Sequence, residues 1–300
     1  MKILVNDGIS AEGAELLRQA GHEVVDTKVP QEELPARIGG YDAIVVRSAT
    51  KVRRDVIDAG LPRLKAIVRG GVGVDNIDVK YAEEKGIKVM NTPAASSDSV
   101  AELALAHMFA LSRFLVAANL SLREGKWEKK RFKGVELAGK TLGILGLGRI
   151  GKSLAKKAQA LGMKVVAHDP YVTSTDVGVD LLTKDEVLAR ADYLSLHIPA
   201  LPEGPAVGAA EIAKMKDGAF LINCARGGVV DEGALIDALD AGKLAGAGVD
   251  VFVGEPNPDP KLATHPKVSV TPHIGASTTE AQSRIGVEVA NLLIGFLTTV

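Results

Sequence analysis

The 300-residue sequence predicts an α/β fold made of two doubly wound domains, each built on a parallel sheet. Short apolar runs rich in β-branched residues alternate with longer amphipathic stretches, which is the pattern of βαβ units. This alternation occurs in two separate series along the chain. Glycine is frequent, with 32 residues, as tight turns between strands and helices require.

The first series contains predicted strands with helices between them. The strands are expected at Lys2–Asn6, Glu23–Asp26, Ala43–Arg47, Ala66–Arg69 and Ile87–Asn91. The helices are expected at Ala11–Ala20, Gln31–Ile38, Arg53–Ala59 and Val79–Lys85. These elements form a predicted first domain over residues 1–92. A last helical stretch, Thr278–Leu297, has no strand after it, so we expect residues 279–300 to pack back on the first domain and complete it.

The second series predicts another domain over residues 93–278. Its strands are expected at Thr141–Leu145, Lys164–Asp169, Tyr193–His197, Ala219–Asn223, Gly246–Val251 and Val268–Thr271. Its helices are expected at Ile150–Leu161, Lys184–Ala189, Ala209–Met215 and Glu232–Ala241. Six such strands would make a full dinucleotide-type sheet. Between the two series, Ser99–Arg123 is predicted as one long helical segment that follows a turn-rich hinge.

Composition and charge exclude several classes of function. The chain is 46% hydrophobic and 24% charged, with a formal net charge of −1, so bulk electrostatics predicts no attraction to nucleic acid or membrane. The N-terminal MKILVNDGIS has no apolar core of a secretion signal, and the expected location is cytoplasmic. The single cysteine, Cys224, cannot form an intrachain disulfide. No His, Cys and Asp cluster has metal-ligand spacing, so no metal is expected.

A glycine motif follows the first strand of the second domain. Gly146, Gly148 and Gly151 form G-x-G-x-x-G, with a predicted strand before it and a helix beginning near Arg149. The N–H groups of that helix would bind a pyrophosphate, as in Rossmann-like sheets. Asp169 ends the next strand and would accept the ribose hydroxyls, while Pro170 and the residue after it offer no cation to a 2′-phosphate. The motif therefore favours NAD over NADP.

Three residues that suit hydride transfer follow three successive strands of the second domain. Reduction of a 2-keto acid needs a cation for the carboxylate and carbonyl, an acid for the developing alkoxide, and a group that orients that acid. Arg226, Glu255 and His273 supply these groups. Because ligands bind outside the carboxyl ends of parallel strands, the three could converge, although each taken singly could be purely structural.

At this point the sequence resembles the D-isomer-specific 2-hydroxyacid dehydrogenase family over essentially its whole length. The segments that carry the resemblance are VVRSATKV (45–52), GVDN (73–76), GIKVMNTP (86–93), KTLGILGLGRIGK (140–152), NCARGGVVDEGAL (223–235), DVFVGEP (250–256) and PHIGAST (272–278). The resemblance implies two Rossmann-like and flavodoxin-like domains with NAD and the active site in the cleft between them. It also implies that the first domain closes on substrate and excludes water.

The resemblance assigns roles to particular residues. It implies that Arg226 binds the substrate carboxylate and C2 oxygen, that His273 is the acid/base, and that Glu255 orients His273 and fixes its tautomer. Asp250 would hold the nicotinamide carboxamide. The remaining residues implied to bind the cofactor, beside the glycines, Arg149, Asp169 and Pro170, are Ile150, His197, Pro199, Cys224, Ala225, Gly275 and Ala276.

The resemblance is closest to members that oxidise D-3-phosphoglycerate to 3-phosphohydroxypyruvate in serine biosynthesis. It implies that Arg47, Arg69 and Asn76 meet this substrate and that Gly70, Gly71 and Val72 offer backbone N–H groups to its carboxylate. Lys130 and Arg131, after Trp127, resemble a segment that reaches the neighbouring subunit's active site, and they could equally be a solvated charge run. A homodimer is expected, both from the resemblance and from the apolar character of Ser99–Arg123.

Two alternatives stay open. The same Arg226, Glu255 and His273 would serve a glyoxylate or hydroxypyruvate reductase or another D-2-hydroxyacid dehydrogenase. A protein of another class, which senses NAD without turnover, could retain all three residues as well. Larger relatives carry C-terminal regulatory domains, and the sequence ends at Val300, so feedback by serine through such a domain is not expected.

Overall fold

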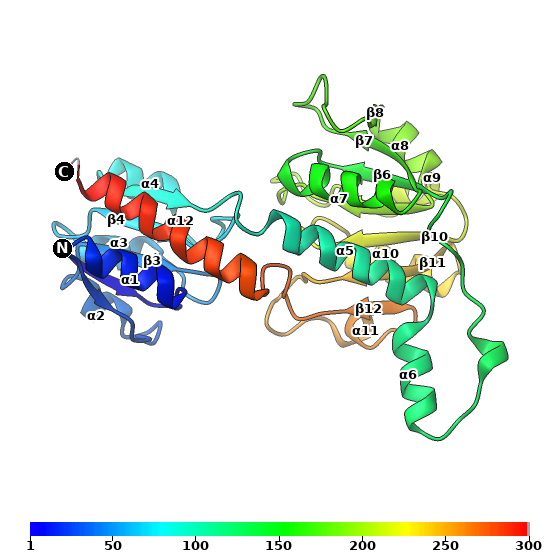
Figure 1. Ribbon diagram of the computed structural model, residues 1–300, viewed down its shortest axis with the longest axis horizontal. Helices are drawn as coiled ribbons and strands as arrows, with labels where there is room; N and C mark the ends of the chain where they lie inside the picture. The colour runs from blue at the N-terminus through cyan, green and yellow to red at the C-terminus, as the bar shows by residue number, and fades with distance from the viewer. Residues whose placement is uncertain (299–300) are drawn as a thin grey trace. The chain divides into compact units, whose positions relative to one another are not determined.

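A computed structural model describes residues 1–298, and the chain divides into two compact units (Figure 1). One unit comprises Met1–Ser96 and Ala276–Val300, and the other comprises Ser97–Gly275. The sequence patterns predict the boundaries after residues 92 and 278. Each unit is a parallel sheet covered by helices, so the predicted α/β fold class is confirmed.

The first unit is built on a five-stranded parallel sheet in the order β2-β1-β3-β4-β5. Its strands are β1 (Lys2–Val5), β2 (Glu23–Val25), β3 (Ala43–Val46), β4 (Ala66–Arg69) and β5 (Lys88–Asn91). Its helices are α1 (Ala11–Gln19), α2 (Leu34–Ile38), α3 (Arg54–Gly60), α4 (Val79–Glu84) and α12 (Thr279–Leu297). The strand order reverses between β1 and β3, which makes the carboxyl ends of these strands the expected place for a ligand.

Side chains of this parallel sheet are buried on both faces, because the connecting helices cover both. Along β3 every residue is buried, and successive side chains point to opposite faces. Ile44 and Val46 pack with apolar residues of α2 and α3, whereas Ala43 and Val45 pack with those of α1 and α12. A strand buried on both sides reads as a continuous apolar run, which is how the sequence patterns located it.

The C-terminal helix α12 packs against α1, at opposite ends of the sequence (Figure 1). Glycines allow this close approach: a Cβ built on Gly13 would lie 2.3 Å from the carbonyl oxygen of Gly286, and one on Gly286 would lie 2.1 Å from Oγ of Ser10. The same Ser10 caps the start of α1. Helix α12 therefore lies in the same compact unit as α1.

The second unit is built on a seven-stranded parallel sheet in the order β12-β11-β10-β9-β6-β7-β8. Its strands are β6 (Thr141–Leu145), β7 (Lys164–His168), β8 (Asp180–Leu181), β9 (Tyr193–Leu196), β10 (Ala219–Asn223), β11 (Leu244–Val249) and β12 (Val268–Val270). The order reverses between β6 and β9, as in dinucleotide-binding sheets. The expected count of six was wrong, because the two-residue β8 is too short to give a pattern in the sequence.

Helices cover both faces of this second sheet. They are α5 (Ser97–Ser112), α6 (Leu115–Arg123), α7 (Arg149–Ala160), α8 (Lys184–Arg190), α9 (Ala209–Lys214), α10 (Glu232–Asp240) and α11 (Pro260–Ala263), with a 3₁₀ turn η1 at Lys129–Arg131. Helices α5 and α7 pack with Leu142 and Ile144 of β6, and α8, α9 and α10 pack on the other face with Leu194 and Leu196 of β9. These helices thus pack on the two faces of the sheet and not on the edge formed by the carboxyl ends of its strands.

The expected single helix over Ser99–Arg123 was also wrong. The helix breaks at Phe114, which has a φ of 53°, and α5 and α6 meet at a bend of 59°. Beyond the break, the N–H of Val135 donates to the carbonyl of Ser112 at 3.0 Å and so satisfies an end group of α5. Within the described residues, no single helix is long and apolar enough to span a membrane; only α5 and α6 taken together reach that length and composition.

Candidate functional site

The glycine turn joins β6 to α7 and is shaped by two close contacts. Gly146 has a φ of 93°, and a Cβ there would lie 2.4 Å from the carbonyl oxygen of His197. A Cβ on Gly151 would lie 2.3 Å from the carbonyl oxygen of Gly146. These two glycines therefore let the turn pack on β9 and let α7 pack on the turn.

The middle glycine leaves space at the start of α7. A Cβ on Gly148 would meet no described atom within 4 Å, and no side chain caps the first turn of the helix. Helix α7 begins at Arg149, and no side-chain oxygen accepts the N–H groups at its positive end. An anionic group such as a pyrophosphate fits this arrangement, because the backbone can approach it closely and supply donors.

Asp169 follows β7 and is anchored beside that turn. One carboxylate oxygen accepts the N–H of Leu147 at 2.8 Å, and the other accepts the N–H of Tyr171 at 2.9 Å. Each oxygen keeps further lone pairs for a ribose hydroxyl. Pro170 and Tyr171 are exposed beyond it. The negative charge thus stands near the start of α7, where it disfavours a second phosphate on the ribose.

Other residues assigned to the cofactor follow β9 and β10. His197 lies 2.9 Å through Nε2 from Oγ of Ser195, and burial lowers its pKa to about 4, so the imidazole is neutral at pH 7. Pro199 is exposed two residues further along. Cys224 and Ala225 are buried, and burial raises the pKa of the Cys224 thiol. A protonated, buried thiol is a wall of the site and not a nucleophile.

Arg226, Glu255 and His273 follow three neighbouring strands. Arg226 follows β10, Glu255 follows β11 and His273 follows β12. The turns after β10 and β11 touch, since a Cβ on Gly227 would lie 2.1 Å from the carbonyl oxygen of Phe252. Nη1 of Arg226 donates to the carbonyl of the preceding residue at 2.6 Å. The three side chains therefore lie along one edge of the sheet, the carboxyl edge.

Glu255 and His273 form a hydrogen-bonded pair. Nδ1 of His273 lies 2.7 Å from Oε2 of Glu255. The side chain of His273 is 36% exposed and that of Glu255 is 34% exposed. Because a carboxylate only accepts, Nδ1 carries the hydrogen and Nε2 of a neutral His273 is a bare acceptor. His273 also has a φ of 54°, a left-handed conformation that is costly for a residue with a Cβ and is often kept at functional sites.

Asp250 ties down the loop that carries His273. It is 1% exposed, and its carboxylate accepts the N–H of Ile274 at 2.8 Å, the N–H of Gly275 at 2.9 Å and the hydroxyl of Thr271 at 2.6 Å. The family resemblance implies a cofactor contact for Asp250 and does not imply this structural role. Ala276, the next residue in the chain, falls in the first unit, where its carbonyl accepts Nε2 of Gln282.

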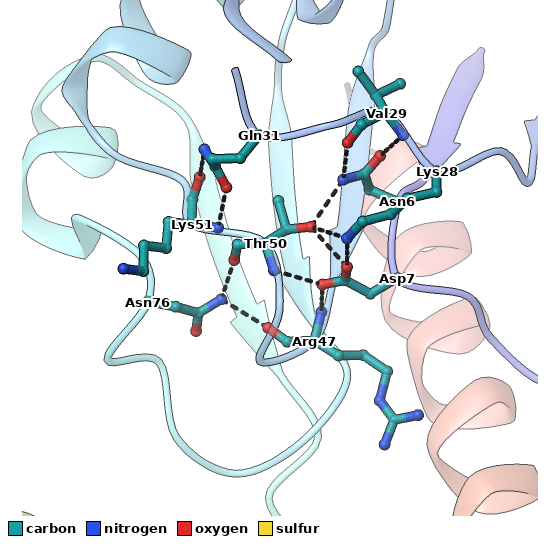
Figure 2. A network of polar contacts seen from close by, with 9 residues as sticks. All are labelled: Asn6, Asp7, Lys28, Val29, Gln31, Arg47, Thr50, Lys51 and Asn76. Atoms are coloured by element: carbon teal, nitrogen blue, oxygen red, sulfur yellow. Dashed lines mark hydrogen bonds and ion pairs between the residues drawn. The ribbon is translucent and has the colours of Figure 1, made fainter. Parts of the chain in front are cut away.

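The first unit holds a polar network at the carboxyl ends of β1 and β3 (Figure 2). The side chain of Asp7 is 4% exposed and pairs with Lys28, and it also accepts the N–H groups of Arg47 at 2.7 Å and Thr50 at 3.0 Å. Asn76 donates to the carbonyls of Arg47 at 2.7 Å and Thr50 at 2.6 Å. Both hydrogens of the Asn76 amide thus hold the loop after β3, a role that the sequence patterns did not indicate.

Arg47 projects out of this network, as Figure 2 shows. Its Nη1 donates to Oε1 of Gln282 on α12 at 2.5 Å. Burial lowers the pKa of Arg47, and the charge of Asp7 opposes that effect. An arginine guanidinium stays protonated at neutral pH. The sequence patterns missed Gln282 and Asp7, although Asp7 follows a strand directly and the rule that located Arg47 applies to it.

The turn after β4 is partly used by internal bonds. The N–H of Gly70 donates to the carbonyl of Val46, and the N–H of Gly71 donates to that of Arg69, each at 2.9 Å. The guanidinium of Arg69 lies over Gly71, because a Cβ there would be 1.6 Å from Nη1. Val72 has its carbonyl bound by Asn91 at 2.6 Å. The expectation of free N–H donors at Gly70 and Gly71 therefore needs correction.

The charged segment after α6 is exposed. Lys130 and Arg131 lie in η1, and Arg131 pairs with Glu128 at 3.2 Å. The ring of Phe132 lies 5.7 Å from the guanidinium of Arg131.

Within residues 1–298, no group of three or more His, Cys, Asp or Glu side chains is arranged to hold a metal ion.

Comparison with known proteins agrees with this geometry. The family model for the NAD-binding domain of D-isomer specific 2-hydroxyacid dehydrogenases matches residues 105–275. A hydroxypyruvate reductase from Thermotoga maritima is 49% identical over 96% of this chain and 95% of its own length. A D-3-phosphoglycerate dehydrogenase from Methanocaldococcus jannaschii is 48% identical over 97% of this chain and 56% of its own length. The chain thus spans about half of that second relative.

A solved structure, the TT0316 protein from Thermus thermophilus, is also similar. It shares 35% identity with a TM-score of 0.92, covering 100% of this chain and 97% of that one. The matched NAD-binding domain contains the glycine turn, Asp169 and Asp250, so the cofactor is NAD. The chain belongs to the D-isomer-specific 2-hydroxyacid dehydrogenase family.

Proposed function

We propose that this protein oxidises D-3-phosphoglycerate to 3-phosphohydroxypyruvate with NAD, in serine biosynthesis. The pair formed by Glu255 and His273 at 2.7 Å carries the chemical part of the proposal. NAD, when bound, accepts the hydride that leaves C2. His273 takes the proton of the C2 hydroxyl on Nε2, and Glu255 stabilises the imidazolium that results. Arg226 holds the carboxylate and polarises the C2 oxygen.

Arg47 supports a phosphorylated substrate. Its guanidinium is held at the carboxyl edge of the first sheet by a loop that Asp7 and Asn76 fix in place. Gln282 occupies one donor of this guanidinium with an uncharged amide oxygen. A phosphate would replace that uncharged acceptor by anionic oxygens, which can accept two N–H groups of the guanidinium in a forked geometry.

The second candidate is reduction of hydroxypyruvate or glyoxylate. It is favoured by the 49% identity to a hydroxypyruvate reductase that matches this chain along nearly its whole length. The chemistry at Arg226, Glu255 and His273 would be the same in the opposite direction. The two candidates differ in the need for Arg47, because hydroxypyruvate and glyoxylate carry no phosphate.

Turnover assays separate these candidates. Purified protein is tested with D-3-phosphoglycerate and NAD, and with 3-phosphohydroxypyruvate, hydroxypyruvate and glyoxylate, each with NADH. The proposal expects kcat/KM for 3-phosphohydroxypyruvate to exceed that for hydroxypyruvate by at least about tenfold, the value of one charge-assisted bond. A higher value for hydroxypyruvate would favour the reductase. No turnover with any of these acids would favour a protein that only senses NAD.

We also propose that the protein is a homodimer that uses α6. Large apolar side chains are exposed on this helix and beside it, among them Leu115, Val116, Leu120, Leu122 and Trp127. Helix α6 contributes only Ser121 to the buried residues of its own unit. Such an apolar surface is usually covered by a partner, and we propose that this partner is a second copy of the chain. Lys130 and Arg131 follow this surface closely in the chain.

Analytical ultracentrifugation of Leu120→Asp and of the matched Leu161→Asp tests the dimer. Leu161 is an exposed leucine at the end of α7 and lies outside this surface. We expect the first variant to sediment as a monomer at micromolar concentration and the second to remain dimeric. A monomeric wild-type protein would contradict the proposal.

A further inference from the structure

His107 is a buried histidine that the proposed chemistry does not use. It lies on α5, is 2% exposed, and packs so tightly on β11 that a Cβ on Gly248 would be 2.6 Å from its own Cβ. Burial lowers its pKa, so the ring is neutral at pH 7 and has one donor and one acceptor. Nδ1 lies 2.9 Å from Oγ of Ser269, and Nε2 lies 3.1 Å from Oγ1 of Thr271.

The direction of every hydrogen bond in this chain of contacts is fixed by Asp250. A carboxylate only accepts, so the hydroxyl of Thr271 must donate to it across 2.6 Å. Oγ1 of Thr271 then has no hydrogen left for His107 and must accept from Nε2. The ring of His107 therefore carries its hydrogen on Nε2, and the hydroxyl of Ser269 donates to the bare Nδ1.

The far end of the chain is the loop of His273. Asp250 binds the N–H groups of Ile274 and Gly275 through its side chain, and its own carbonyl accepts the N–H of His273 at 2.8 Å. His273 sits in a left-handed conformation that needs such support from its surroundings. Without the donor at His107, the hydroxyl of Thr271 would be free to rotate away and Asp250 would lose one of its anchors.

We propose that His107 is a positioning residue for His273, acting through the hydroxyl of Thr271 and the carboxylate of Asp250. This inference rests on the proposed role of His273 as the acid/base. A displaced imidazole would impair proton transfer and therefore kcat, whereas the proposed function assigns binding of the substrate carboxylate to Arg226. Misplacement by about 1 Å is enough to lower a rate as much as 100-fold.

Matched variants test the inference. Thr271→Val removes the hydroxyl at nearly constant shape, and Thr271→Ser keeps it. His107→Leu removes the donor, and His107→Gln keeps an N–H near the position of Nε2. With 3-phosphohydroxypyruvate or hydroxypyruvate and NADH, we expect Thr271→Val and His107→Leu each to lower kcat by about tenfold or more. KM for the keto acid should change less than about threefold, and the Ser and Gln variants should restore kcat to within about threefold.

Further measurements exclude a merely structural effect. The double variant of His107→Leu and Thr271→Val should be no slower than the slower single variant, since both break one chain of contacts. Ring ¹⁵N shifts of His107 should report a hydrogen on Nε2. Equal losses in the Val and Ser variants, wild-type kcat in Thr271→Val, or a hydrogen on Nδ1 would each overturn the inference. A fully active His273→Ala, assayed in parallel, would instead overturn the proposed function.

Discussion

Glu255 binds His273 with one carboxylate oxygen and the backbone of its own turn with the other. Oε2 lies 2.7 Å from Nδ1 of His273, and Oε1 accepts the N–H of Phe252 at 2.9 Å. The carboxylate is therefore fixed at both ends. This arrangement orients the imidazole in the same way that the acid of a catalytic triad does.

The anchoring predicts the effect of Glu255→Gln. The N–H of Phe252 would hold the amide oxygen, so the amide NH₂ would face Nδ1 of His273 and donate to it. The hydrogen of the imidazole would then sit on Nε2, where it cannot accept a proton from the substrate. We expect kcat for oxidation to fall roughly 10²–10⁴-fold, the usual contribution of a general base.

Steady-state kinetics with NAD and the 2-hydroxy acid measure this loss. Glu255→Asp keeps the charge and serves as the matched control, with a smaller loss expected because the shorter side chain lengthens the hydrogen bond. Glu255→Gln with unchanged kcat would mean that the pair does not set the tautomer.

Arg47→Ala is predicted to act on the phosphorylated substrate alone. One lost charge-assisted contact is worth about 1.5–3 kcal/mol, so KM for 3-phosphohydroxypyruvate should rise roughly 10–100-fold. KM for hydroxypyruvate should change little. Arg63→Ala is the control, since Arg63 pairs with Asp42 just before β3, at the amino edge of the same sheet. An equal rise for both keto acids would remove Arg47 from the phosphate site.

The acid sensitivity of the first unit is predicted to depend on Asp7. Burial alone would raise the pKa of Asp7, but hydrogen bonds from Lys28, Arg47 and Thr50 outweigh it and hold the pKa below the ordinary 3.8. A lowered pKa in the folded state stabilises the protein fully above the unfolded value, and that stability is lost as the pH falls through the folded value. The free energy of unfolding of Asp7→Asn should therefore be lower than that of wild type at neutral pH, and the two values should converge in acid.

Urea unfolding at about pH 6 and about pH 3 measures the onset of this convergence, because the two values lie on either side of the ordinary aspartate pKa and the loss begins below it. Asp58→Asn is the control, an exposed aspartate of the same unit that accepts a hydrogen bond from Tyr81. A difference between wild type and Asp7→Asn that is as large at the lower pH would contradict the prediction.

The strands and the strand-end residues could be predicted because their signals are local. Continuous β-branched runs mark β3 and β4. Arg226, Glu255 and His273 are predicted site residues because they follow strands and because their residue types suit hydride transfer. Position after a strand would also have located Asp7. These residues depend on the path of the chain within one sheet, which the sequence pattern describes well.

Other features depend on contacts between distant segments, and no local pattern encodes them. The helix break at Phe114 is fixed by the return of Val135 to the carbonyl of Ser112, and the strand β8 exists only as a partner of β7. In the sequence, His107 is one polar residue within an apolar helix. Only the packing of α5 on β11 and β12 brings it to Ser269 and Thr271. Tertiary packing decided each of these, which is why the sequence patterns gave a continuous helix, one strand fewer and no role for His107.

Asp169→Asn is predicted to weaken the preference for NAD over NADP. The amide can still accept the N–H of Leu147 or Tyr171, but the charge that repels a 2′-phosphate is gone. Because a like-charge contact costs several kcal/mol, the ratio of kcat/KM for NADP to that for NAD should rise at least about tenfold. Asp176→Asn, an exposed acid that pairs with Lys152, should leave the ratio unchanged. An unchanged ratio in Asp169→Asn would place the ribose elsewhere.

Two glycines of α12 are predicted to respond oppositely to the same substitution. In Gly286→Ala the new methyl group would lie 2.1 Å from Oγ of Ser10, so α1 and α12 must move apart, at a cost of about 1–3 kcal/mol in unfolding free energy. In Gly295→Ala the methyl group meets no described atom within 4 Å, and alanine favours the helix by about 0.5–1 kcal/mol. Thermal and urea unfolding should therefore show one variant less stable and the other more stable than wild type. Equal shifts in the two variants would mean that helix propensity, and not the contact between α1 and α12, governs this helix.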